Sequence, residues 1–124
     1  PSPRVNRWRG LTGDEVGICR VLGADVDDEQ RAKAKEAFAK IAEALEAEAA
    51  LPTGPTLNEE RKNRIVEGRE LIAGGLSEIL ESGMSCTDCH KFHDTGDLGT
   101  APDLTGYMSR EWLLAFVRNP AGER

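Results

Sequence analysis

Apolar residues recur along residues 25–50 with the spacing of one helix face, at positions i, i+3, i+4 and i+7. The residues that follow this spacing are Phe38, Ile41, Ala42, Leu45 and Ala49. The opposite face is charged, and alanine, glutamate and lysine, which favour helices, make up most of the segment. Asp27 or Asp28 is the expected N-cap, and the prolines and glycine of residues 51–55 end the helix. The stripe predicts packing in a helical hairpin, with a dimer interface as the alternative.

A second helix is predicted to begin at Asn58 and to end near residues 82–83, where a glycine suits a helix end. One face of this helix carries the apolar residues Ile65, Ile72, Leu76 and Ile79. Gly74 and Gly75 lie in its middle, where glycine is unfavourable. The helix either breaks there or continues because another group must come close. We expect it to continue, with at most a mild kink.

The remaining chain is predicted to be loop, followed by a third helix. Residues 84–106 are rich in polar and turn-forming residues. Ser109 is the expected N-cap of the third helix, and Asn119 followed by Pro120 is expected to end that helix. Strand-like alternation of apolar and polar residues is missing from the sequence. The predicted fold class is therefore all-α.

Length and composition narrow the possible functions. The 124 residues are enough for one domain, or for one small domain with an extension. The net charge of −6 argues against nucleic acid as a partner and favours partners with basic patches. No apolar run is long enough to span a membrane. With aromatic residues at only 5%, a core built from side chains alone would be thin, and a large apolar cofactor would relieve that shortage.

The strongest chemical motif is Cys-Thr-Asp-Cys-His at residues 86–90. Two cysteines three positions apart, followed at once by histidine, form the attachment signature of a c-type haem. Each thiol adds across one haem vinyl group, so that Cys86 and Cys89 become thioether anchors. The next residue, His90, is then placed as the axial ligand of the iron. The motif predicts one covalently bound haem c.

Other chemistries remain open for the same motif. Cys86 and Cys89 could form a zinc half-site, with His90 or His93 as the third ligand and Cys19 or an acidic residue as the fourth. They could instead form a redox-active pair, although no βαβ pattern surrounds them, or they could be structural thiols. The third cysteine, Cys19, is expected to be a buried small residue or a free thiol.

Three segments together resemble a class I cytochrome c. They are the motif at residues 86–90, Ala-Pro-Asp-Leu-Thr-Gly at residues 101–106, and Ser-Arg-Glu-Trp-Leu at residues 109–113. Residues 65–72 are similar to the helix that precedes the motif in this family. The resemblance covers residues 62–124 and is closest to cytochrome c domains attached to quinol–cytochrome c reductase complexes.

The resemblance implies roles for four further residues. The carbonyl of Pro102 would accept a hydrogen bond from Nδ1 of His90, which orients the imidazole and makes it a better donor to iron. Leu104 would pack against the haem ring. Trp112 and Phe116 would line the haem pocket or pack on the first helix of the domain.

The sequence departs from the family at the distal iron ligand, which is normally a methionine from a loop after the third helix. Met84 lies on the attachment side, so Met108 is the one distal candidate in this chain, with a packing role as its alternative. His93 is expected to be exposed or bonded to a haem propionate. We expect that residues beyond 124 are missing, that another chain supplies the ligand, or that the distal site is open. The chain begins at Pro1 without an initiator methionine or signal peptide, so we also expect a processed or excised piece.

These observations predict two regions with distinct roles. Residues 1–57 form an N-terminal arm and amphipathic helix, as an extension or docking element, and residues 58–124 form a cytochrome c-like haem domain that is incomplete at its C-terminus. The expected function is one-electron transfer in a respiratory chain, not enzymatic catalysis by protein groups. The alternatives are a zinc-stabilised interaction module and a haem enzyme or sensor with an open distal site.

The same function sets the expected partners and location. Redox proteins are the expected partners, including a membrane-bound quinol–cytochrome c reductase or oxidase. The expected location is the periplasm or another extracytoplasmic compartment, where c-type haem is attached. Membrane association would come through a partner or a missing segment.

Overall fold

The computed structural model of the chain describes residues 26–81, 83–99 and 101–122, and all regular elements in these ranges are helical. In chain order they are α3 (Asp28–Ala49), α4 (Glu59–Glu70), η1 (Leu71–Gly75), α5 (Leu76–Leu80), η2 (Cys86–Asp88) and α6 (Arg110–Arg118). The all-α class is confirmed for this part of the chain. The predictions for residues 1–23, including Cys19, fall outside the described residues.

The helix boundaries follow from local capping. The side chain of Asp27 accepts a hydrogen bond from the backbone N–H of Gln30, and Asn58 and Ser109 cap α4 and α6 in the same way. Each cap satisfies a backbone donor that has no partner inside its helix. Asn58 and Ser109 are the N-caps that the sequence predicted. For α3 the sequence left Asp27 and Asp28 as alternatives, and Asp27 is the N-cap.

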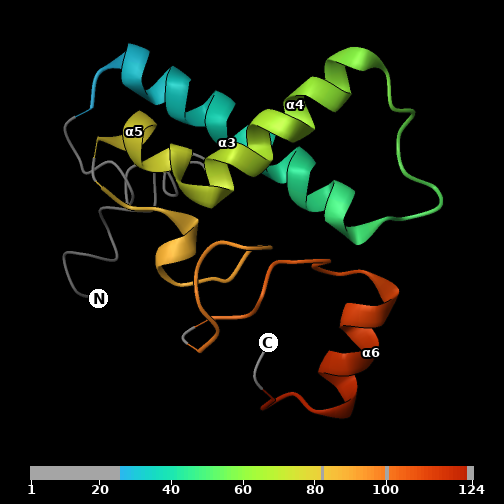
Figure 1. Cartoon of the computed structure of the whole chain (residues 1–124). Coiled ribbons are helices and arrows are strands. Elements are labelled where there is room, and N and C mark those ends of the chain that lie inside the picture. Colours follow the sequence, from blue (N-terminus) through green and yellow to red (C-terminus); the bar gives the residue numbers. More distant parts are fainter. Residues whose placement is uncertain (1–25, 82, 100, 123–124) are drawn as a thin grey trace, which may run out of the picture.

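Helices α3 and α4 form the predicted hairpin, in which α4 crosses α3 (Figure 1). They approach closely at Gly68, where an added Cβ would lie 2.1 Å from the carbonyl oxygen of Lys40 and 2.9 Å from Cβ of Ala44. Ion pairs also join the two helices, between Arg64 and both Glu36 and Glu43, between Lys40 and Glu67, and between Arg61 and Glu46. A glycine is needed at this crossing because no side chain fits between the backbones.

The buried face of α3 differs from the predicted stripe. Its buried residues are Ala34, Ala37, Ile41, Ala44 and Glu48, whereas Ala42 is exposed and Phe38 and Leu45 are half-buried. Small side chains face α4 because Gly68 brings the two helices too close together for larger ones. The buried face of α3 is therefore rotated about the helix axis relative to the face that the apolar stripe predicted.

The second predicted helix is divided at Gly74 by a kink, so the expectation that it continues through Gly74 and Gly75 is wrong and the alternative, a break, is observed. The kink lies in η1, where Gly74 has φ 147°, which is outside helical values. Only glycine adopts this φ readily. The chain therefore bends between α4 and α5. Helix α5 ends at Leu80, and the next residue, Glu81, has a left-handed φ of 53°.

One apolar core joins these elements. It contains residues of α3, η1 and α5, together with Phe92 and Leu104 from the segment that follows η2. The division of the chain at residues 57 and 58 stays a prediction, and the core contains residues from both sides of it. The loop that carries the cysteine motif is therefore packed on the helical hairpin.

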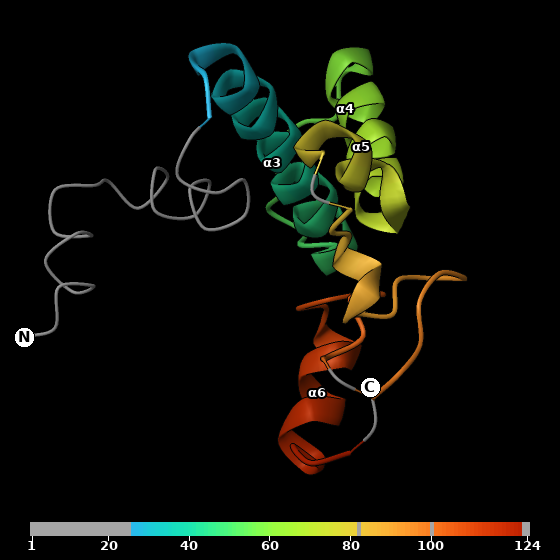
Figure 2. The ribbon, with the colours of Figure 1, turned by 90° about the vertical axis from the view of Figure 1, so that its left-hand side faces the viewer.

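Helix α6 stands apart from the hairpin in both views (Figures 1 and 2). None of its residues is buried, although one side is apolar. Among the described residues, no helix has the length and apolar character needed to cross a bilayer.

Candidate functional site

The cysteine motif forms a short turn of 3-10 helix at η2. The backbone N–H of Ser85 donates to Oδ2 of Asp88 at 2.8 Å, and Oγ of Ser85 accepts from the N–H of Thr87. The N–H of His90 donates to the carbonyl of Cys86 at 2.9 Å, so the first and last residues of the motif are linked through the backbone. This turn places Cys86, Cys89 and His90 on one compact segment.

The two cysteines differ in their surroundings. Cys86 is half-buried against the core, whereas Cys89 is exposed. Burial raises the pKa of the Cys86 thiol, and the negative charge of Asp88 acts in the same direction. Cys86 is therefore held as a protonated thiol at neutral pH.

His90 is oriented by a single backbone acceptor. Its Nδ1 atom lies 2.7 Å from the carbonyl oxygen of Pro102, which is the contact that the resemblance implied. A carbonyl oxygen can only accept, so Nδ1 carries the proton in this contact. In the neutral ring, Nε2 then keeps its lone pair and can bind a metal.

The segment that supplies Pro102 is held in place by Leu104. The backbone N–H of Leu104 donates to the carbonyl of Lys91 at 2.8 Å, and its side chain is buried in the core with Phe92. Leu104, predicted to face a haem ring, thus packs among protein side chains in this structure.

The two aromatic residues of α6 stack on each other beside the same loop. The rings of Trp112 and Phe116 lie 5.4 Å apart and nearly parallel, and the ring of Tyr107 meets Trp112 edge-on. Nε1 of Trp112 donates to the carbonyl of Asp103 at 2.9 Å, next to Pro102. No residue of α6 is buried in this structure, and both roles predicted for this face stay predictions.

A hollow of about 560 Å³ is lined by residues of both α6 and this loop. Its lining includes Leu98, Asp103, Thr105, Trp112 and Ala115. Trp112 is the one predicted site residue that lines it.

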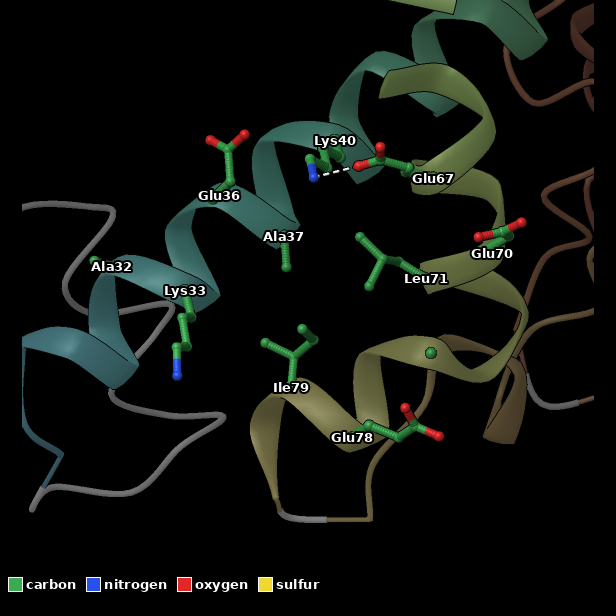
Figure 3. Close-up of a pocket in the computed structure, with 11 residues that line it drawn as sticks. Ala32, Lys33, Glu36, Ala37, Lys40, Glu67, Glu70, Leu71, Glu78 and Ile79 are labelled. Atoms are coloured by element: carbon green, nitrogen blue, oxygen red, sulfur yellow. Dashed lines mark hydrogen bonds and ion pairs between the residues drawn. The ribbon is translucent and has the colours of Figure 1, made fainter. Parts of the chain in front are cut away.

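A second hollow, of about 630 Å³, lies between α3 and the segment η1–α5 (Figure 3). Apolar side chains of Ala37, Leu71 and Ile79 point into it, and charged residues including the Lys40–Glu67 pair surround it. None of the predicted cofactor-binding residues lines this hollow.

The remaining ligand candidates lie in different places. Met108 has a left-handed φ of 63° in the turn before α6, and its side chain is exposed, as is that of Met84. The side chain of His93 is half-exposed, and its Nε2 lies 2.9 Å from Oε1 of Glu48. While this pair is kept, zinc could bind His93 only through Nδ1.

Glu48 is the residue that sequence analysis missed. Its side chain is only 5% exposed, and its carboxylate interacts with His93, with the backbone N–H of Gly106 at 2.8 Å and with Nε of Arg69 at 3.3 Å. Burial pushes the pKa of this carboxyl upward, but the hydrogen bonds from His93 and Gly106 and the charges of His93 and Arg69 outweigh burial and hold it below its ordinary value. A signal was present in the sequence, because Glu48 follows Ile41 of the predicted stripe by seven positions, which places the two residues on the same helix face.

Within the described residues, no three His, Cys, Asp or Glu side chains are grouped so that they could hold a metal ion. Comparison of the chain with protein-family models, with characterised proteins and with solved structures gives no match. Any functional proposal therefore depends on the residues themselves.

Proposed function

We propose that the chain carries one haem c, bound through Cys86 and Cys89 with His90 as axial ligand, and transfers single electrons. The observation that carries this proposal is the 2.7 Å contact between Nδ1 of His90 and the carbonyl of Pro102. Many structural histidines make a hydrogen bond, but this one occurs directly after two cysteines with haem-attachment spacing.

The chain's own groups have separate tasks in this proposal. The turn at η2 holds both thiols and the imidazole on one short segment. The carbonyl of Pro102 fixes the imidazole so that Nε2 presents its lone pair, and it increases the basicity of the ring. The haem iron, once bound, supplies the ferric–ferrous couple, and no acid, base or nucleophile of the protein is needed.

The structure offers a surface that suits a large apolar ring. Apolar side chains near the Pro102 loop and along α6 are exposed, with Phe116 at 41%, Leu98 at 44% and Leu113 at 39%. Exposed apolar groups of this kind mark binding surfaces when they gather in one region. The stacked pair Trp112 and Phe116, and the hollow that Trp112 lines, would suit contact with a planar ligand.

The finer assignment follows from the same proposal. Residues 58–124 would form a class I cytochrome c-like domain, and the net charge of −6 suits redox partners with basic surfaces. The proposed setting is extracytoplasmic and within a respiratory chain, in contact with a quinol–cytochrome c reductase or an oxidase. The distal ligand would come from Met108, from residues outside this chain, or from solvent at an open site.

The deciding experiment is expression of the chain in a host that attaches haem c, followed by intact mass measurement and a reduced absorption spectrum. We expect a mass increment of one haem and the α-band of a c-type haem. The variant Cys86→Ser with Cys89→Ser should lose both, whereas Thr87→Ser, a change between the two cysteines, should keep both.

The same sample separates the alternatives. Elemental analysis should find one iron per chain, and stoichiometric zinc without a haem increment would contradict the proposal and favour the zinc module. Binding of carbon monoxide to the reduced native protein would favour an open distal site over a six-coordinate carrier.

A further inference from the structure

Glu48 interacts with both ends of the loop that contains the proposed axial ligand. This carboxylate lies near the end of α3 and is almost completely buried. A buried carboxylate is unfavourable unless its oxygens have partners. Oε1 faces Nε2 of His93 at 2.9 Å, and Oε2 accepts from the N–H of Gly106 at 2.8 Å.

These two partners belong to two segments of one loop, residues 90–93 and residues 102–106, which we call its limbs. His93 follows His90 by three residues, and Gly106 follows Pro102 by four. The limbs are also joined to each other, because the N–H of His93 donates to Oγ1 of Thr105 at 2.7 Å. The Glu48 carboxylate therefore fixes the loop to α3 where its two limbs meet.

The contact between His90 and Pro102 lies within this clamped loop. Next to it, the N–H of Leu104 donates to the carbonyl of Lys91 and keeps the two limbs paired. A shift of one limb against the other would change the distance between Nδ1 of His90 and the Pro102 carbonyl. The position of this carbonyl thus depends on what holds the limbs.

We propose that Glu48 is a positioning residue for the His90 imidazole, acting through its hydrogen bonds to His93 and Gly106. This inference rests on the proposed function, since it concerns the imidazole as an iron ligand. It extends that function by assigning α3, which lies outside the region that resembles a cytochrome c, a part in setting the reduction potential.

The physical link is the basicity of the imidazole. A tight hydrogen bond from Nδ1 to Pro102 makes Nε2 a stronger donor, which stabilises ferric iron. Loosening the loop weakens that bond, so the reduced form becomes more favourable. Loss of the Glu48 contacts should therefore raise the reduction potential.

The variants His93→Gln and His93→Leu test this link without a charge difference between them. Glutamine keeps an N–H that can reach Glu48, whereas leucine has no donor. Both replace a residue with a left-handed φ of 50°, so their backbone strain is similar. Glu48→Gln is the third variant, and Glu43→Gln is its control on the same helix, because Glu43 pairs with Arg64 of α4 and not with the loop.

Two measurements on the haem-loaded chain decide the outcome. At the wild-type midpoint potential, His93→Leu and Glu48→Gln should increase the ratio of reduced to oxidised protein by about threefold, as expected for loss of a group that supports a metal ligand. His93→Gln and Glu43→Gln should stay near wild type. Hydrogen exchange of the Leu104 amide should accelerate about tenfold in His93→Leu, because the limbs separate more often. In His93→Gln it should stay near the wild-type rate.

Each result bears on the proposal. If the hydrogen-exchange rate of the Leu104 amide is unchanged in His93→Leu and Glu48→Gln, Glu48 does not hold the two limbs together, and the proposal is overturned. Faster exchange with equal potentials for the two histidine variants would overturn the positioning of His90. A chain without a haem-sized mass increment would overturn the proposed function itself, and the mass spectrum distinguishes that result from the other two.

Discussion

Nδ1 of His90 lies 2.7 Å from the carbonyl oxygen of Pro102, although the two residues are 12 positions apart in the sequence. Between them the chain leaves the cysteine turn, packs Phe92 into the core and returns to place the proline carbonyl beside the ring. The contact decides which nitrogen of His90 carries a proton. That choice leads to a prediction for both histidines of the chain.

In the chain without haem, the two neutral histidines should have opposite tautomers. His90 should carry its proton on Nδ1, because it faces a carbonyl, and His93 should carry its proton on Nε2, because that atom faces the Glu48 carboxylate. Nitrogen chemical shifts of the two imidazoles above pH 8 will show this. Equal shift patterns for the two rings would contradict the geometry of the loop.

The two motif cysteines should differ in reactivity before haem attachment. Cys86 is half-buried with a raised pKa, whereas Cys89 is exposed. In a Cys19→Ser background, iodoacetamide should modify Cys89 about tenfold faster than Cys86, because the thiolate is the reactive form and needs access. Peptide mass mapping after short reaction times measures both rates. In urea the difference should disappear, and a difference that persists there would point to local sequence as its cause.

Gly68→Ala should destabilise the fold, although alanine favours helices. Propensity alone would stabilise α4 by about 1 kcal/mol. The added Cβ would lie 2.1 Å from the Lys40 carbonyl, so the helices must separate, which costs about 1–3 kcal/mol or more. Urea unfolding should therefore show a lower midpoint than wild type. Asn63→Ala, at an exposed position of α4, serves as control and should not lower it.

Glu48 should make the fold sensitive to acid. Its pKa is held below the ordinary value of 4.5, because the contacts with His93, Gly106 and Arg69 outweigh the effect of burial. The ionised form therefore stabilises the folded state above pH 4.5, and this contribution is lost as the pH falls through the folded-state pKa.

Glu48→Gln tests this dependence by urea unfolding at pH 7 and at lower pH. The variant should be less stable than wild type at pH 7 by about 1–3 kcal/mol, since it loses a charged hydrogen-bond acceptor. It should also lose less stability on acidification than wild type does. Parallel pH profiles for the two proteins would show that another carboxyl is responsible.

The helices and their starting residues could be predicted because their signals are local. Asn58 and Ser109 cap the helices that were assigned to them, and the two glycines at positions 74 and 75 mark the place where the second helix kinks. Each depends on residues within about one turn of the chain. The buried face of α3 could not be predicted by hydrophobicity, because the close approach at Gly68 selects small side chains over Phe38 and Leu45.

The amino-acid sequence determined the all-helical class, the capped helix starts and the spacing of Cys86, Cys89 and His90, since these depend on neighbouring residues. Tertiary structure alone decided that Glu48 meets His93 and Gly106, and that α6 leaves its apolar side exposed. The reason is physical: the Glu48 contacts join residues up to 58 positions apart, and exposure of α6 depends on where the whole chain places it, so neither follows from neighbouring residues.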